Sequence, residues 1–125
     1  MNIFVSYTTR DSHINKEYLA SISNIISSFG SPYIDLLDNY ATDKQTHVET
    51  MLNSSDLVLL LSSELINESQ WVHWELTQAK KLNIPILEVC VKENNKGKVS
   101  KDIFSRFKLY IEANKSIQAT ASCGT

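Results

Sequence analysis

The sequence predicts one α/β domain, a three-layer sandwich in which helices cover both faces of a parallel sheet of four to five strands. Three observations lead to this prediction. Short apolar runs alternate with segments that have helical periodicity. The runs are apolar on successive residues, as in strands that are covered on both faces. The chain of 125 residues has the length of a single domain.

Strands are predicted where short β-branched or apolar runs lie between polar loops. The chain begins with such a run, NIFVSY, and the run DLVLLLSS is apolar enough for a central strand. The expected strands are residues 2–7, 33–37, 56–63 and 83–91, with a short fifth strand at the sheet edge at 108–113.

Helices are predicted where apolar residues recur three or four positions apart. Ile14, Tyr18, Ile22 and Ile25 follow this spacing, and the sequence from Gly30 to Pro32 ends the helix. The expected helices are residues 13–29, 46–55, 71–82 and 99–107. Residues 1–115 then form the domain, and 116–125 form a flexible tail.

Ligand sites in parallel sheets lie beyond the carboxyl ends of the strands. That rule selects the loops at 6–11, 38–40 and 62–71. The stretch SQWVHWELTQA (69–79) brings both tryptophans and Glu75 to the same edge. Trp71 and Glu75 are four residues apart and therefore adjacent on a helix. Two interpretations remain open from spacing alone: a ligand site, or a packed ring beside an acid that complements the helix dipole.

Several other functions are disfavoured by composition. The formal net charge of −2 argues against a nucleic-acid surface. A phosphoacceptor receiver of flavodoxin-like fold needs acidic residues at the end of its first strand and an aspartate at the end of its third. Here the first strand ends in Ser6 and Tyr7, and the third ends in Ser62 and Ser63. The three glycines form no dinucleotide loop, and the histidines are too scattered for a metal site. Two cysteines, no leader and no long apolar segment favour a cytoplasmic protein that does not enter a membrane.

The sequence resembles the TIR (Toll/interleukin-1 receptor-like) family over roughly residues 1–91. IFVSYTTRD resembles the first motif of the family, and SDLVLLLSSELINESQWVHWELTQA resembles its third strand and following helix. In the second stretch the family pattern is Ser69, Trp71, Glu75 and Leu76, followed by an alanine. The loop DNYATDKQ lacks the Arg-Asp-x-x-Pro-Gly sequence of receptor and adaptor members. The chain is therefore more similar to the compact TIR-like proteins of bacterial anti-phage systems, of the Thoeris type.

The resemblance implies an enzyme that cleaves NAD, with Glu75 as its catalytic residue. NAD is then the substrate, with no other cofactor and no metal. We expect Ser6, Tyr7 and Thr8 to line the substrate pocket from the first loop, Asp38 and Tyr40 to line it from the second, and Trp71 to shape the surroundings of Glu75.

The resemblance also implies partners and a product. The product would be a nucleotide signal derived from ADP-ribose, either a cyclic isomer or a conjugate, in anti-phage defence. Self-association would support activity, and a separate effector protein would sense the product. Two alternatives stay open: a non-catalytic TIR module for protein interaction, and an enzyme similar to nucleoside deoxyribosyltransferases.

Overall fold

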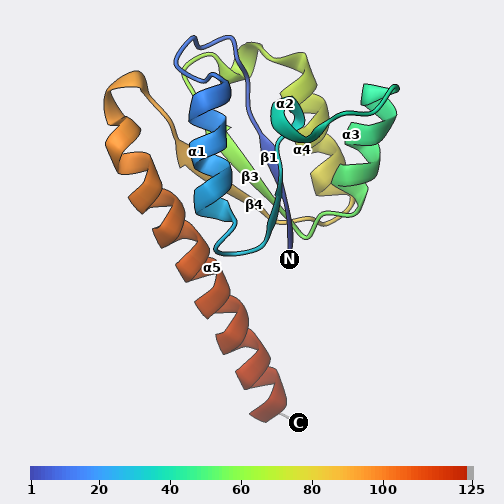
Figure 1. The fold of residues 1–125 in the computed structure, drawn as a ribbon. Helices are drawn as coiled ribbons and strands as arrows, with labels where there is room; N and C mark the ends of the chain where they lie inside the picture. The colour runs from blue at the N-terminus through green and yellow to red at the C-terminus, as the bar shows by residue number, and fades with distance from the viewer. Residues whose placement is uncertain (124–125) are drawn as a thin grey trace.

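The structure is a computed structural model that describes residues 1–123, with side chains through residue 114. Four strands form one parallel sheet in the order β2-β1-β3-β4 (Figure 1). The strands are β1 (Asn2–Ser6), β2 (Ser31–Tyr33), β3 (Leu57–Ser62) and β4 (Ile86–Cys90). The α/β class, the parallel direction and the central position of β3 are as predicted from the sequence.

Helices cover both faces of this sheet, with α1 and α5 on one side and α3 and α4 on the other (Figure 1). None of the helices within the described residues combines the length and the apolar character that a membrane crossing needs. The helices are α1 (Lys16–Ile26), α2 (Asp35–Asp38), α3 (Lys44–Asn53), α4 (Gln70–Lys81) and α5 (Lys96–Cys123), with short 3-10 turns η1 (Ile66–Glu68) and η2 (Glu93–Asn95).

The side chains of β1 lie alternately on the two faces of the sheet, because successive residues of a strand point to opposite sides. Ile3 and Val5 pack in the core under α1 and α5. Phe4 packs in the second core, with Val48 of α3 and Ala79 of α4. Ser6 therefore belongs to the face that α4 covers, and it is fully buried there.

The second strand is shorter than predicted, and the expectation of a strand at 33–37 is wrong beyond Tyr33. The chain turns into α2 because the Asp38 side chain binds the backbone locally. The Ile34 N–H donates to Asp38 Oδ2 at 2.7 Å, which satisfies a donor at the start of the helix. Pro32 is tolerated in β2 because β2 is an edge strand.

The predicted fifth strand at 108–113 is also wrong, since these residues continue α5. The buried residues Val99, Ile103 and Phe107 are spaced by four, and Tyr110 packs against the same core three residues beyond the end of the expected helix. The sheet therefore has four strands. The tail expected at 116–125 falls beyond the residues whose side chains are described, so its flexibility stays a prediction.

Candidate functional site

The helix α4 is placed by a side-chain cap at its first turn. Ser69 precedes the helix with an extended backbone, and its hydroxyl accepts a hydrogen bond from the Val72 N–H at 3.2 Å. Val72 and Ala79, seven residues apart and therefore on one side of the helix, then face the sheet and are buried. Glu75 lies on an adjoining side of the helix and points toward the end of β1.

Glu75 and Ser6 form a buried hydrogen bond at the carboxyl end of β1. The Ser6 hydroxyl donates to Glu75 Oε1 at 2.8 Å. The Glu75 side chain is only 4% exposed, and Ser6 is not exposed at all. Burying a charged group is energetically unfavourable unless the group is paired. The Ser6 hydroxyl is the hydrogen-bond partner that the fold provides for the buried carboxylate of Glu75.

Burial raises the pKa of Glu75 from 4.5 to about 7, because removal from water disfavours the charged form. The hydrogen bond from Ser6 opposes this shift, the nearby negative charge of Asp35 adds to it, and the Trp71 indole opposes it. No lysine or arginine with a described side chain forms an ion pair with Glu75. The carboxylate is thus desolvated, close to a second acid and without a cation.

Asp35 is a member of this site that the sequence reading missed. It begins α2, and its Oδ1 accepts hydrogen bonds from the Tyr33 hydroxyl at 3.0 Å and from Asn39 Nδ2 at 2.7 Å. The sequence predicts a strand at 33–37, which contains Asp35, and this prediction gives no indication that the side chain lies near the end of β1. In the sequence Asp35 is a single acid after Ile34, and no motif around it indicates a functional site.

Tyr7 links the end of β1 to α2. Its hydroxyl accepts a hydrogen bond from the Leu36 N–H at 2.9 Å. Burial raises the pKa of Tyr7 to about 12, the contact with Leu36 opposes the rise, and the charges of Asp35, Glu75 and Asp38 increase it. Tyr7 therefore lies within range of the negative charges of all three acids.

Trp71 borders Glu75 on α4 and presents one side to solvent. Its ring stacks on Trp74 with 5.1 Å between the centroids and an angle of 18° between the planes. Trp74 packs against the core beneath α3 and α4, whereas Trp71 is 39% exposed. The pair therefore forms a partly exposed aromatic surface beside the carboxylate.

The remaining predicted residues are less closely associated with Glu75. Thr8 is buried, and its hydroxyl accepts a hydrogen bond from the Arg10 N–H at 3.3 Å, which shapes the first loop. Asp38 is exposed and engages the backbone of its own turn. Tyr40 is 92% exposed and is not gathered with the others. The structure thus brings together Ser6, Tyr7, Trp71 and Glu75, and it leaves Tyr40 outside this group.

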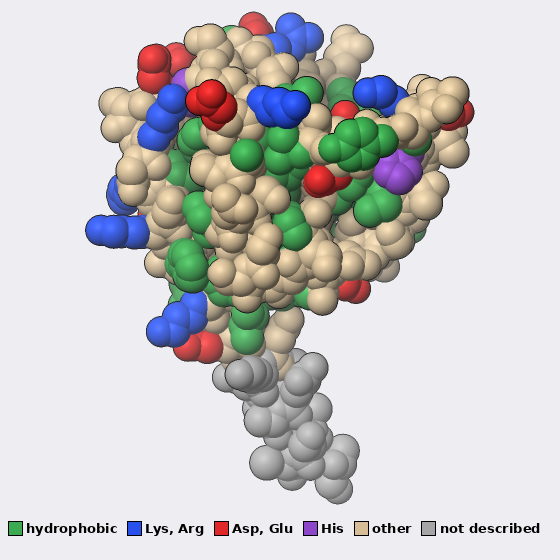
Figure 2. Space-filling model, in the orientation of Figure 1, with side chains coloured by type: hydrophobic (Ala, Val, Ile, Leu, Met, Phe, Trp, Pro, Cys, Tyr) green, Lys and Arg blue, Asp and Glu red, His purple; other side chains and the backbone are tan. Residues whose placement is uncertain are grey.

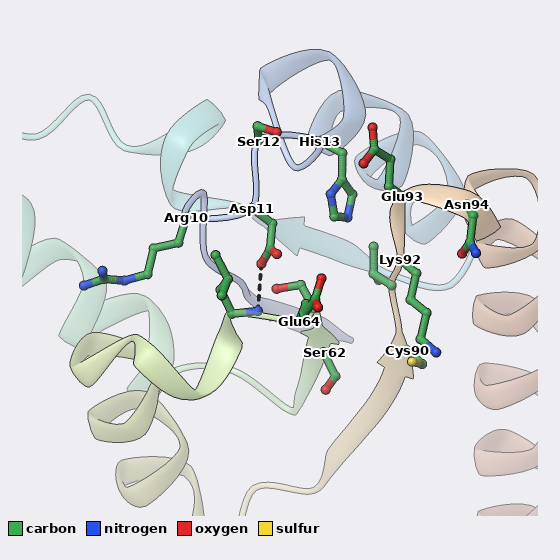
Figure 3. Close-up of a pocket in the computed structure, with 13 residues that line it drawn as sticks. Arg10, Asp11, Ser12, His13, Ser62, Glu64, Cys90, Lys92, Glu93 and Asn94 are labelled. Carbon is green, nitrogen blue, oxygen red and sulfur yellow. Dashed lines mark hydrogen bonds between the residues drawn. The ribbon is translucent and has the colours of Figure 1, made fainter.

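A large cavity lies at the same edge of the sheet but does not include Glu75. It has a volume of about 860 Å³ and opens among the loops that follow β1, β3 and β4 (Figure 3). Arg10, Asp11 and His13 line it from the first loop, and Ser62 and Ser63 from the end of β3. The sequence predicts a ligand site at the loops 6–11 and 62–71 without singling out these residues, and it does not predict that the loop after β4 takes part. Among the described residues, no group of three acidic, histidine or cysteine side chains is arranged to hold a metal ion.

A comparison with known protein families matches residues 4–96 to the family described as Thoeris protein ThsB, TIR-like domain. The match covers most of the chain and includes the last three residues of β1, with Ser6, and the whole of α4, with Glu75. The chain belongs to the Thoeris ThsB TIR-like family. None of the curated proteins matches the chain closely enough to be counted as a relative.

Membership of the ThsB family confirms the resemblance to TIR proteins and the flavodoxin-like TIR fold. It assigns this ThsB-family chain to a Thoeris defence system, which has other components. The matched region ends at residue 96, so most of α5 lies outside it.

Proposed function

We propose that this ThsB-family protein cleaves the bond between nicotinamide and ribose in NAD, with Glu75 as the catalytic carboxylate. The observation that supports the proposal is the electrostatic setting of Glu75. A buried carboxylate that lacks a cation and has an acid nearby is stabilised by any positive charge that enters. The nicotinamide ring of NAD carries such a charge, so the substrate would supply what the folded protein lacks.

The same setting suits the transition state. Nicotinamide leaves as a neutral molecule and takes the bonding electron pair with it, so positive charge moves onto the ribose carbon and its ring oxygen. A carboxylate held in place by Ser6 stabilises that charge without reorganising. Because the leaving group needs no protonation, a single acid is enough. The exposed face of Trp71 offers a flat wall for an aromatic ring.

Access to Glu75 requires movement, because the side chain is 4% exposed and neither of the described cavities contains it. The segment most suited to move is α2 with the residues after it. This helix has four residues, and one of its links to β1 is the hydrogen bond from the Leu36 N–H to Tyr7. The exposed Tyr40 follows directly. We expect this segment to open when NAD binds and to close over it.

The product and the partners extend this proposal. The ADP-ribosyl group released from nicotinamide would pass to water, to an internal atom or to a second small molecule, and the cyclic isomer or conjugate would serve as a signal. A separate effector would sense it in the cytoplasm. Self-association would order the mobile segment near α2 and so raise activity.

The test is Glu75→Gln, which keeps the size of the side chain and an oxygen for Ser6. Nicotinamide release from NAD is measured at high protein concentration for the parent, for Glu75→Gln and for Glu68→Gln, an exposed control on η1. We expect a loss of about 100-fold or more for Glu75→Gln and no change for the control. Equal rates in all three proteins would disprove the role of Glu75.

The mass of the product decides which signal is made. Deoxynucleosides are offered in the same assay. If they were consumed while NAD stayed intact, the chain would instead act as a deoxyribosyltransferase.

A further inference from the structure

The cavity at the ends of β3 and β4 is a second candidate site, distinct in its residues from the Ser6–Glu75 pair. Its volume of about 860 Å³ is within the usual range for small-molecule sites. The loops after β1, β3 and β4 all contribute to its wall (Figure 3). Ser62 is two residues beyond Leu60, the partner of Ser6 in the sheet, so the cavity begins about 7 Å further along the neighbouring strand.

Two polar atoms in the wall lack a hydrogen-bond partner among the described residues. They are the hydroxyl oxygen of Ser63 and Nε2 of His13, and both atoms are buried. The Ser63 side chain as a whole is only 5% exposed. Buried polar groups are nearly always satisfied in native proteins, so a rotation of either side chain that brought its polar atom to a ligand in the cavity would be favourable.

Asp11 supplies a fixed acceptor in the same cavity wall. Its side chain is 7% exposed, and its Oδ2 accepts a hydrogen bond from the Leu65 N–H at 3.2 Å. That bond ties the loop after β1 to the loop after β3 and holds the carboxylate in place. His13 projects into the cavity from the same loop as Asp11 (Figure 3).

The balance of charge narrows the class of ligand. Arg10 and Lys92 contribute two positive charges to the wall, and Asp11, Glu64 and Glu93 contribute three negative ones. The Arg10 guanidinium also turns away from the cavity (Figure 3). Basic and acidic side chains are interspersed along this edge of the molecule (Figure 2). A polyphosphate would be repelled by this wall, whereas a group rich in hydroxyls would not.

We infer that this cavity binds the ribosyl group of a nucleoside, with Asp11 accepting hydrogen bonds from its two neighbouring hydroxyls. A carboxylate is the side chain that commonly recognises a ribose in this way. Ser63 and His13 complete the set of polar partners. The inference does not depend on cleavage at Glu75.

Binding is tested by NMR on the isotope-labelled full chain, titrated with adenosine, with 2′,3′-dideoxyadenosine and with inorganic phosphate. We expect saturable shifts of the amide signals around Asp11, Ser63 and Val91 with adenosine. The dideoxy compound lacks both hydroxyls and should bind at least about tenfold more weakly, because the carboxylate would be left without its partners. Phosphate should cause no saturable shift at these signals.

Asp11→Asn is the matched variant, since its amide oxygen can still accept the hydrogen bond from Leu65. It should weaken adenosine binding at least about tenfold and leave the dideoxy compound unaffected. Asp102→Asn, on α5 away from the cavity, is the control and should bind like the parent. Ser63→Ala removes the unpartnered hydroxyl with little change in volume and should also weaken adenosine binding. Equal binding of the two nucleosides, or no saturable shift with adenosine, would overturn the inference.

The ribosyl group in the cavity could belong to NAD or to a separate nucleoside. The two cases are distinguished with Glu75→Gln, which we expect to bind NAD without consuming it. NAD is titrated with and without saturating adenosine. If adenosine raises the apparent Kd for NAD, the cavity receives a ribose of the substrate itself. If NAD binds equally well in both cases, the cavity takes a separate nucleoside. A failure of NAD cleavage leaves the adenosine titration unaffected, so the two proposals are tested separately.

Discussion

Ser6 and Glu75 lie 69 residues apart in the chain and meet in a buried hydrogen bond of 2.8 Å between β1 and α4. The contact joins the two stretches that carry the resemblance to the TIR family, one at the start of the chain and one after β3. Since Ser6 and Glu75 are both removed from water, their bond fixes the direction in which the carboxylate presents itself. Because Glu75 is buried, its pKa depends on the hydrogen bond from Ser6 and on the charge of Asp35.

Glu75→Gln is expected to stabilise the folded protein at alkaline pH. The pKa of Glu75 is about 7 when folded and 4.5 when unfolded, so the folded state binds more protons between these values. The stability of the parent therefore falls as pH rises from 4.5 through 7, and the neutral glutamine escapes this loss. We expect Glu75→Gln to exceed the parent by about 1 to 3 kcal/mol at pH 8 and to match it near pH 4.5.

Urea unfolding at several pH values measures this difference. Glu88→Gln, at an exposed position on β4, is a suitable control and should show no comparable gain at pH 8. A stability difference between Glu75→Gln and the parent that stays constant across pH would mean that Glu75 is ionised to the same degree in the folded and unfolded states.

Ser6→Ala is expected to raise the pKa of Glu75 further, because it removes a hydrogen bond that favours the charged form. It should lower the free energy of unfolding by roughly 1 to 3 kcal/mol at pH 8, where the carboxylate would lose its buried partner. In a Glu75→Gln background, the loss caused by Ser6→Ala should not depend on pH. The four proteins of this cycle are compared by urea unfolding at pH 5 and pH 8. A pH-dependent loss in both backgrounds would point to another group.

The order of strands and helices could be predicted from the sequence because the periodicity is strong and local. β1, β3, β4, α1 and α4 were all expected close to their actual positions. The failures have local causes as well. Asp38 accepts a hydrogen bond from the Ile34 N–H and Asp35 accepts hydrogen bonds from neighbouring side chains, so the apolar run ends in a helix. The residues after Phe107 look like a strand only when they are considered apart from α5.

Gly30 offers a test of the packing at the beginning of the sheet. A Cβ at this position would collide with the Met1 carbonyl oxygen, and that carbonyl accepts the Ser31 N–H at 2.8 Å. Because backbone atoms cannot move aside cheaply, Gly30→Ala should destabilise the domain by about 1 to 3 kcal/mol. Gly97, in α5, has nothing within 4 Å of such a Cβ. Gly97→Ala should therefore leave stability unchanged or raise it by up to about 1 kcal/mol. Thermal unfolding of both variants measures the contrast, and equal effects would contradict this account.

The candidate site could be predicted only in part. The resemblance to the TIR family and the position at the carboxyl ends of strands predict Glu75, Ser6, Tyr7 and Trp71 as site residues. The structure gathers these side chains at the end of β1, and their part in a reaction stays a prediction. Asp35 was missed because its role depends on where β2 stops. Tyr40 was expected in the pocket because it follows the second strand, but the intervening turn of helix carries it into solvent. Loop conformation of this kind depends on tertiary contacts, which spacing in a sequence does not contain.

The pH dependence of NAD cleavage should follow the ionisation of Glu75. If its carboxylate is the form that stabilises the ribosyl cation, kcat/KM rises about tenfold per pH unit below pH 7 and levels off above it, because the pKa of the free protein is about 7. Saturating NAD brings a positive charge beside Glu75 and lowers its pKa, so kcat should level off at a lower pH than kcat/KM does. Initial rates of nicotinamide release between pH 5 and 9 measure both profiles. Tyr7 has a pKa of about 12 and stays neutral over this range. A profile that falls as pH rises from 5 to 7 would instead require Glu75 to act in its protonated form.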